Sequence, residues 1–248
     1  ADILRNLCDI DSEDLPGFMA SKIAKHLPLL LHLDPEALDA QAREAVVFLG
    51  AILGLELSEQ FDIPVHEMDA QERKTATFRA LAWLLRSLAS QRPLQMVVEN
   101  LHFADNASIE ALGYLFEALR DDPVMLVGLM RPAKDQASAK LIAIAREILA
   151  DAATEIEFDR LDQVDSDKMV QQLLRSDQVP EDVLALVWVR AGGNPLYIEE
   201  IIRSMVDDGV IEQAEDGNIR VARDLDEIEM PSSIQGIIIA RVDKLQSG

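Results

Sequence analysis

The residues of this sequence best suited to chemistry stand at the end of a short apolar run. Leu94 to Val98 is rich in branched residues, and Glu99 and Asn100 follow it directly. A carboxylate at the carboxyl end of a buried strand can hold Mg²⁺, directly or through water, as in nucleotide-binding sheets. Buried strands also end in polar residues for structural reasons alone, so both interpretations of Glu99 and Asn100 stay open.

Three other groups of residues are candidates for binding. Arg131 follows a second apolar run, Val124 to Met130, and it either binds a phosphate or is solvated or paired with Asp135. The run Gly192-Gly193-Asn194-Pro195 is typical of a helix end followed by proline in the first turn of the next helix. The four histidines are dispersed without the spacing of a metal site, so we expect His102 to be packed or to bridge to solvent.

Alternating strands and helices must position the first of these residues. After the strand predicted at Leu94–Val98, the polar cluster at 105–108 predicts a helix start, and Val124–Met130 predicts a second buried strand. A helix over about 136–150 and a third strand at Glu155–Phe158 follow. This order predicts a parallel sheet with right-handed crossovers.

Helices are predicted on both sides of the sheet. Asp34-Pro35 predicts the start of a helix, and the stretch from Asp69 or Gln71 to Arg92-Pro93 has the clearest helical period. After the sheet we expect helices over 165–175, 180–191 and 195–208, a hairpin over 210–221 with Asp216-Gly217 in its turn, and a last helix from Pro231.

Composition limits the classes of partner. The 248 residues carry a formal charge of −22, which argues against nucleic acid and against an anionic membrane surface. The longest apolar runs, such as 27–33 and 234–240, are far shorter than a membrane span. Cys8 is the single cysteine, so neither a disulfide framework nor a cysteine metal site can form within one chain, and we expect a cytoplasmic protein.

Four blocks of the sequence occur in the same order as similar blocks of a known protein family: Val97–Asp105, Leu126–Pro132, Arg190–Glu200 and Met230–Leu245. Together they resemble the STAND branch of the AAA-like P-loop ATPases. The first is similar to the Walker B stretch, where two acids precede Leu-His-Trp-Ala-Asp, and the second to the fourth strand with its sensor-1 position. The third is similar to the Gly-Asn-Pro-Leu-Phe block of the lid, and the fourth to the start of the winged-helix segment.

The resemblance implies a fold and a set of binding residues. The fold is α/β, an incomplete P-loop NTPase-type parallel sheet flanked by helices, followed by a helical lid and the start of a winged-helix-like subdomain. The implied divisions are a helical segment at 1–92, the α/β core at 93–162, the lid at 163–208 and the hairpin with the winged-helix start at 209–248. In the intact protein, Glu99 would hold Mg²⁺, Arg131 would read the γ-phosphate of ATP and Pro195 would touch its base.

Two departures from the family pattern change the expected activity. Asn100 stands where the family usually has its second acid, and an amide can hold a water but cannot accept its proton. The sequence also contains no Gly-x-x-x-x-Gly-Lys-Ser/Thr loop, so we expect a piece cut after the Walker A motif that does not bind ATP by itself. The family's Walker A strand lies between the strands expected here at Val124–Met130 and Thr154–Phe158, so we expect a rearranged sheet or a homodimer that covers this edge.

The leading functional hypothesis is a regulatory nucleotide switch in a bacterial signalling protein. Such modules occur, by resemblance, in class III adenylate and guanylate cyclases, in helix-turn-helix transcription regulators and in some protein kinases, and the acidic balance favours the cyclase context. Its partner would be an effector domain of the same polypeptide. The alternative is a degenerate scaffold that keeps the fold for protein–protein contact. The enzyme activity of the parent, as cyclase or ATPase, stays open.

Overall fold

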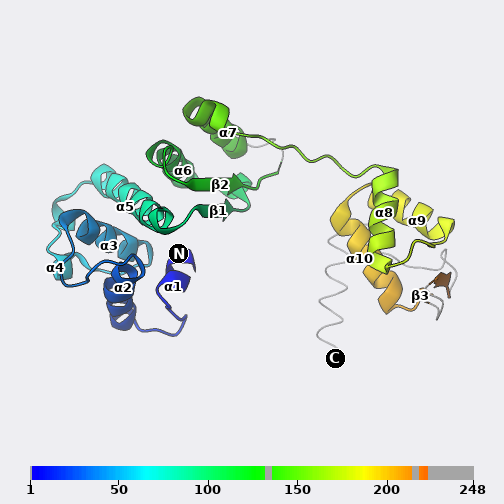
Figure 1. The fold of residues 1–248 in the computed structure, drawn as a ribbon, viewed down its shortest axis with the longest axis horizontal. Coiled ribbons are helices and arrows are strands. Elements are labelled where there is room, and N and C mark those ends of the chain that lie inside the picture. Colours follow the sequence, from blue (N-terminus) through cyan, green and yellow to red (C-terminus); the bar gives the residue numbers. More distant parts are fainter. Residues whose placement is uncertain (1, 132–135, 214–217, 223–248) are drawn as a thin grey trace. The chain divides into compact units, whose positions relative to one another are not determined.

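The computed structural model of the chain describes residues 2–131, 136–213 and 218–222. It forms two compact units, residues 1–155 and 156–248 (Figure 1). Among the described residues, no helix combines the length and the apolar character that crossing a lipid bilayer would require. Asp135, the Asp216-Gly217 turn and the helix expected from Pro231 lie outside the described residues, and the four-part division stays a prediction.

The first unit begins with a group of helices around an apolar core. Ile23, Leu27, Val46 and Leu49 are completely buried in it. The elements of this group are α1 (Asp2–Leu7), α2 (Pro16–Leu30), α3 (Ala40–Ile52), α4 (Ser58–Phe61), the 3₁₀ turn η1 (Val65–Glu67) and α5 (Ala70–Gln91).

An aspartate sets the start of α3, but not the one that the sequence suggested. The Asp39 carboxylate accepts a hydrogen bond from the Ala42 amide at 2.8 Å and caps the helix. The helix start predicted at Asp34-Pro35 is wrong. The Asp34 side chain accepts from the Glu36 amide at 3.0 Å and closes a turn, because aspartate stabilises turns as readily as helix starts.

The helix α5 confirms its predicted start and end. Asp69 accepts a hydrogen bond from the Glu72 amide at 2.8 Å, and the Glu72 side chain accepts from the Asp69 amide at 2.7 Å. This reciprocal capping box satisfies two amide groups that the helix itself leaves without partners. The helix ends at the Arg92-Pro93 step, because the residue before a proline avoids helical geometry. Its carboxyl end therefore leads directly into the sheet.

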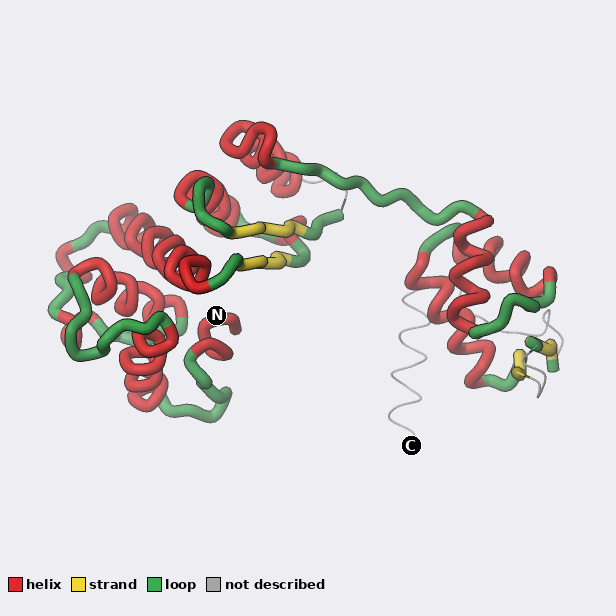
Figure 2. The backbone as a smooth tube through the Cα atoms, in the orientation of Figure 1, coloured by secondary structure: helices red, strands yellow, loops and turns green. Residues whose placement is uncertain are grey.

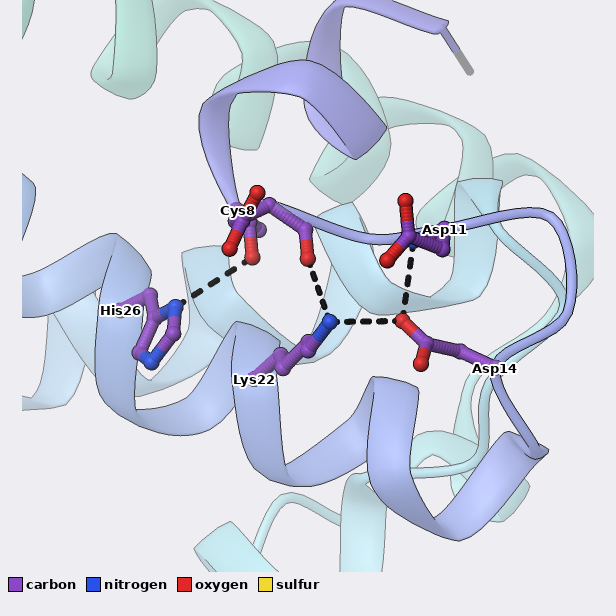
Figure 3. A network of polar contacts seen from close by, with 6 residues as sticks. Cys8, Asp11, Asp14, Lys22 and His26 are labelled. Carbon is purple, nitrogen blue, oxygen red and sulfur yellow. Dashed lines mark hydrogen bonds and ion pairs between the residues drawn. The ribbon is translucent and has the colours of Figure 1, made fainter.

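Lys22 of α2 holds the loop that follows α1. Its ammonium group donates to the Asp9 carbonyl oxygen and, at 2.8 Å, to the Asp14 carboxylate, which also accepts from the Asp11 amide at 2.9 Å (Figure 3). The bond from Lys22 lowers the pKa of Asp14, and the same bond raises the pKa of Lys22. The network ties a loop rich in acids to one cationic side chain.

Two parallel strands form the sheet of the first unit. β1 (Leu94–Val98) pairs with β2 (Val124–Gly128), with Leu94 opposite Val124 and Val98 opposite Gly128. The helix α6 (Asn106–Ala118) connects them, and the Asp105 carboxylate caps it by accepting from the Ser108 amide at 2.7 Å. Both strands and their parallel pairing confirm the prediction from sequence, and β2 is two residues shorter than the apolar run that predicted it.

The two faces of this sheet differ in their cover. Leu94, Met96 and Val124 pack against residues of α5 and α6. On the opposite face, Val97 is 47% exposed and Met125 is 62% exposed. Parallel sheets are ordinarily covered on both faces. Within the described residues, this sheet is covered on one face only.

The third strand predicted at Glu155–Phe158 is wrong. The helix α7 (Gln136–Leu149) and the 3₁₀ turn η3 (Ala150–Ala152) are followed by residues 153–162, which form neither helix nor strand (Figure 2). Ile156 and Phe158 are 70% and 84% exposed. Alternating apolar residues form a strand only where a neighbouring strand offers hydrogen bonds. In the described residues, the parallel sheet consists of β1 and β2 alone.

The described part of the second unit packs three helices and a hairpin around Val183, Val187, Ile198 and Ile201, which are completely buried. Its helices closely match those predicted, and its two strands pair antiparallel as expected for a hairpin. The elements are α8 (Gln163–Leu174), α9 (Glu181–Ala191), α10 (Pro195–Asp207), β3 (Ile211–Gln213) and β4 (Ile219–Val221).

Candidate functional site

The carboxyl edge of the sheet carries the first predicted site residues. Glu99 and Asn100 follow β1 directly, and both are exposed. Asn100 has a left-handed backbone, with φ 58° and ψ 33°, and it precedes the 3₁₀ turn η2 (Leu101–Phe103). Asparagine adopts this conformation more readily than most residues. The sharp turn therefore gives Asn100 a local structural reason to be an amide residue, in addition to any role in chemistry.

Arg131 lies beyond the end of β2 at the same edge. The pairing continues past both strands, since the Leu129 amide donates to the Val98 carbonyl at 2.9 Å and the Leu101 amide donates to the Leu129 carbonyl at 3.1 Å. Because parallel strands end at a common edge, the structure brings Glu99, Asn100 and Arg131 to the carboxyl edge of the sheet. Arg131 is exposed to solvent.

The His102 side chain has an environment that the sequence did not predict in detail. Both of its ring nitrogens are buried, and neither has a hydrogen-bond partner among the described residues. Its ring lies 4.1 Å from that of Phe103, centroid to centroid, and α7 packs over η2. Of the two predicted roles, packing is confirmed and bridging to solvent is not found. A buried imidazole without a partner is unusual, because burying a polar group costs free energy unless it is hydrogen-bonded.

Asp105 is a structural carboxylate and not a free one. Its hydrogen bonds with Ser108 lower its pKa, the side-chain bond most and the bond from the Ser108 amide next. This leaves Glu99 as the acid at the strand end without such a capping role. In the described part of the chain, no three side chains from histidine, cysteine, aspartate and glutamate come together as a metal site. A single carboxylate suits Mg²⁺ when phosphate oxygens and water complete the coordination.

Pro195, the fourth predicted site residue, belongs to the second unit. It is exposed in the first turn of α10, which Asn194 caps by accepting a hydrogen bond from the Leu196 amide at 3.1 Å. Gly192 and Gly193 precede it with φ angles of 54° and 74°. This is the predicted local structure, a helix end followed directly by a new helix.

A close backbone contact explains the second glycine of this turn. The Gly193 carbonyl accepts a hydrogen bond from the Leu161 amide at 2.9 Å, and a Cβ atom on Gly193 would lie 2.2 Å from the Leu161 carbonyl oxygen. Arg160 donates to the neighbouring Gly192 carbonyl at 3.2 Å. The turn before Pro195 therefore fastens the end of segment 153–162 to the helices of the second unit. The sequence shows the glycine pair but not its partner.

The described part of the first unit also contains an open cavity of about 360 Å³ between α5, α6 and α7. Phe78 and Tyr114 line it, with ring centroids 5.9 Å apart, and Lys74 and Glu110 form an ion pair at it. The pairing with Lys74 lowers the pKa of Glu110. None of the predicted site residues lines this cavity. Lys74 and Glu110 neutralise each other, and the remaining charged side chain of the lining is the exposed Glu117.

Part of the second unit matches the model of a protein family. Residues 162–220 match the model of a domain of unknown function (DUF8739). No curated protein and no solved structure matches the chain. The matched residues span α8, α9, α10 and the hairpin, so the similarity covers the helical core of the second unit, including the turn before Pro195.

Proposed function

We propose that this chain is part of a regulatory nucleotide switch, similar to the ATPase modules of the STAND branch of the AAA-like P-loop ATPases. The observation that carries the proposal is the parallel pair β1 and β2, whose common carboxyl edge bears Glu99, Asn100 and Arg131. Ligands of parallel α/β sheets bind at this edge. The proposed fold is the P-loop NTPase type, with a helical lid at 163–208 and the start of a winged-helix-like subdomain after it.

Each residue at the edge has a role that follows from its chemistry. Glu99 would hold Mg²⁺, and Arg131 would bind the terminal phosphate of ATP as a charged, forked donor. Asn100 orients a water without accepting its proton, so hydrolysis is slow or absent. A site that binds ATP and keeps it intact suits a switch better than a motor, because the bound state then persists.

The phosphate-binding loop of this switch comes from outside the 248 residues, because they contain no Gly-x-x-x-x-Gly-Lys-Ser/Thr sequence. The chain by itself therefore does not bind ATP. In the intact polypeptide, ATP bound at the sheet edge would shift the lid helices and so reposition an effector domain. An adenylate or guanylate cyclase domain is the effector that we favour, with a helix-turn-helix regulator as the alternative, in the cytoplasm in either case.

A second candidate function, a scaffold for protein–protein contact, is favoured by two observations. Asn100 removes the acid that hydrolysis needs, and the sheet leaves the side chains of Val97 and Met125 exposed on one face. In this case the fold would serve as a binding surface after losing its nucleotide.

Calorimetry with ATP and ADP in the presence of Mg²⁺ separates the two functions. In the natural polypeptide that contains this chain, a switch binds ATP more tightly than ADP, and Arg131→Ala removes this preference because the arginine contacts only the terminal phosphate. Arg43→Ala is the matched control, since Arg43 is an exposed arginine of α3 in the same unit. A polypeptide that binds neither nucleotide is a scaffold, and a preference for ATP that survives Arg131→Ala places the terminal phosphate elsewhere.

A further inference from the structure

The outer edge of β2 has no strand paired with it among the described residues. Toward β1, the chain uses the Pro123 carbonyl, which accepts from the Leu94 amide at 2.9 Å, and the Leu129 amide, which donates to Val98. Backbone groups alternate in direction along a strand. The amide and carbonyl groups of Leu126 and Gly128 therefore point away from β1, where the described residues supply no strand.

The exposed face beside this edge is apolar. Met125 is 62% exposed, Leu129 is 45% exposed and Val97 is 47% exposed. An open strand edge next to exposed apolar side chains is the kind of surface that pairs with another strand, and natural proteins ordinarily protect such edges with charges, proline or a cover. No lysine or arginine lies within Val124–Gly128.

The charges that flank β2 are complementary to a second copy of themselves. Asp121 and Asp122 precede the strand and Arg131 follows it. Asp121 and Arg131 are both exposed, whereas Asp122 accepts a hydrogen bond from Arg86 at 2.9 Å within its own unit. Two antiparallel copies of β2, related by a two-fold axis at Leu126, bring the turn that carries Asp121 in each copy toward the Arg131 of the other.

The same two-fold axis satisfies the backbone. Leu126 lies opposite Leu126 of the second copy, and its outward amide and carbonyl pair with those of that copy. Val124 lies opposite Gly128, where the Gly128 amide meets the Val124 carbonyl, since the Val124 amide already donates to the Asp122 carbonyl at 2.7 Å. Met125 lies opposite Val127 on the exposed face, which extends the apolar surface across the axis. The outer edge of β1 lacks this match, because an axis at Val97 places Glu99 beside Gln95, with no opposite charge.

We infer that this chain forms a symmetric dimer in which β2 pairs antiparallel with β2 of a second copy, joined at its ends by ion pairs between Asp121 and Arg131. The small sheet becomes a continuous four-stranded sheet through the axis, and the interface is isologous, so it closes at two copies. The inference concerns the 248-residue chain by itself: it uses Arg131 and the outer edge of β2, which ATP and the Walker A strand would take instead in the proposed switch.

Sedimentation velocity of the 248-residue chain over a wide concentration range tests the dimer. We expect a reversible monomer–dimer equilibrium. Asp121→Arg and Arg131→Asp each turn two symmetry-related attractions into repulsions, so each raises the dimer Kd by about tenfold. The double variant Asp121→Arg/Arg131→Asp restores the original affinity, because the swapped charges again meet their opposites.

The matched controls are Glu13→Arg and Arg43→Asp, which make the same charge changes at exposed positions of the same unit, away from β2. They leave the Kd unchanged, although the net charge shifts equally. A chain that stays monomeric overturns the inference. A dimer whose affinity ignores the Asp121 and Arg131 reversals, or is not restored by the double variant, also overturns it.

Cross-linking tests the register directly. Met125→Cys chains mixed with Val127→Cys chains form an intermolecular disulfide faster than either variant alone, because positions 125 and 127 lie opposite each other in a non-hydrogen-bonded pair, within disulfide reach. The native Cys8 is buried and does not interfere. Equal rates in the mixed and separate samples contradict this pairing.

Discussion

Replacing Gly193 by alanine is expected to destabilise the second unit through one backbone contact. The added Cβ atom would meet the Leu161 carbonyl oxygen at 2.2 Å, far inside van der Waals contact, and the obstacle is backbone and not a flexible side chain. The turn must open, and the 2.9 Å hydrogen bond from the Leu161 amide to the Gly193 carbonyl is lost with it.

Two contributions set the magnitude of this loss. A non-glycine residue at φ 74° costs about 1–2 kcal/mol, and the hydrogen bond contributes about 0.5–1.5 kcal/mol. We therefore expect Gly193→Ala to lower the free energy of unfolding by about 1.5–3.5 kcal/mol. Gly209→Ala is the matched control, because Gly209 has φ 62° but nothing within 4 Å of a Cβ atom. It should cost only the conformational part, about 1–2 kcal/mol.

The two tryptophans make the assay specific for one unit. Trp83 belongs to α5 in the first unit and Trp188 to α9 in the second. In a Trp83→Phe background, urea unfolding followed by fluorescence reports Trp188 alone, and the midpoint gives the loss in each glycine variant. Equal losses in Gly193→Ala and Gly209→Ala would refute the argument, because they would show that the contact with Leu161 does not constrain the turn.

Three further predictions concern the first unit. Asn100→Ala should destabilise it by about 1 kcal/mol because alanine resists the left-handed backbone, and Asn100→Gly should restore most of the loss in the same denaturation assay. His102→Leu should raise the melting temperature, because it removes buried nitrogens that have no partner among the described residues; a lower value would show that the ring is satisfied. The lowered pKa of Asp14 stabilises the fold above the ordinary aspartate pKa of 3.8, and this stabilisation is lost as the pH falls through the folded value. Asp14→Asn should therefore flatten the acid limb of a stability–pH curve, and an unchanged acid limb would contradict this.

The parts of the fold that local signals determine were predictable from sequence. The capping box at Asp69, the cap at Asp105 and the apolar runs of β1 and β2 all occur where the residues indicate them. The start of α3 was not predictable, because Asp34 and Asp39 carry the same chemistry and either could cap a helix. Residues Glu155–Phe158 have the alternating pattern of a strand but do not form one, because no strand of the described residues pairs with them.

The candidate site was predictable to a similar extent. The positions of Glu99 and Asn100 follow from the end of an apolar run, and their common edge with Arg131 follows from parallel pairing. The burial of the His102 nitrogens depends on α7 packing over η2, which no local pattern shows. The contact of Gly193 with Leu161 likewise joins residues far apart in sequence, so the glycine alone could indicate only a turn.

The most direct test of the central proposal is calorimetric titration of ATP and ADP, with Mg²⁺, into the natural polypeptide that contains this chain, before and after Arg131→Ala. We predict that the polypeptide prefers ATP and that the variant binds the two nucleotides equally, while Arg43→Ala changes nothing. Absence of nucleotide binding, or a preference for ATP that survives in Arg131→Ala, would contradict the assignment of this sheet edge as the switch site.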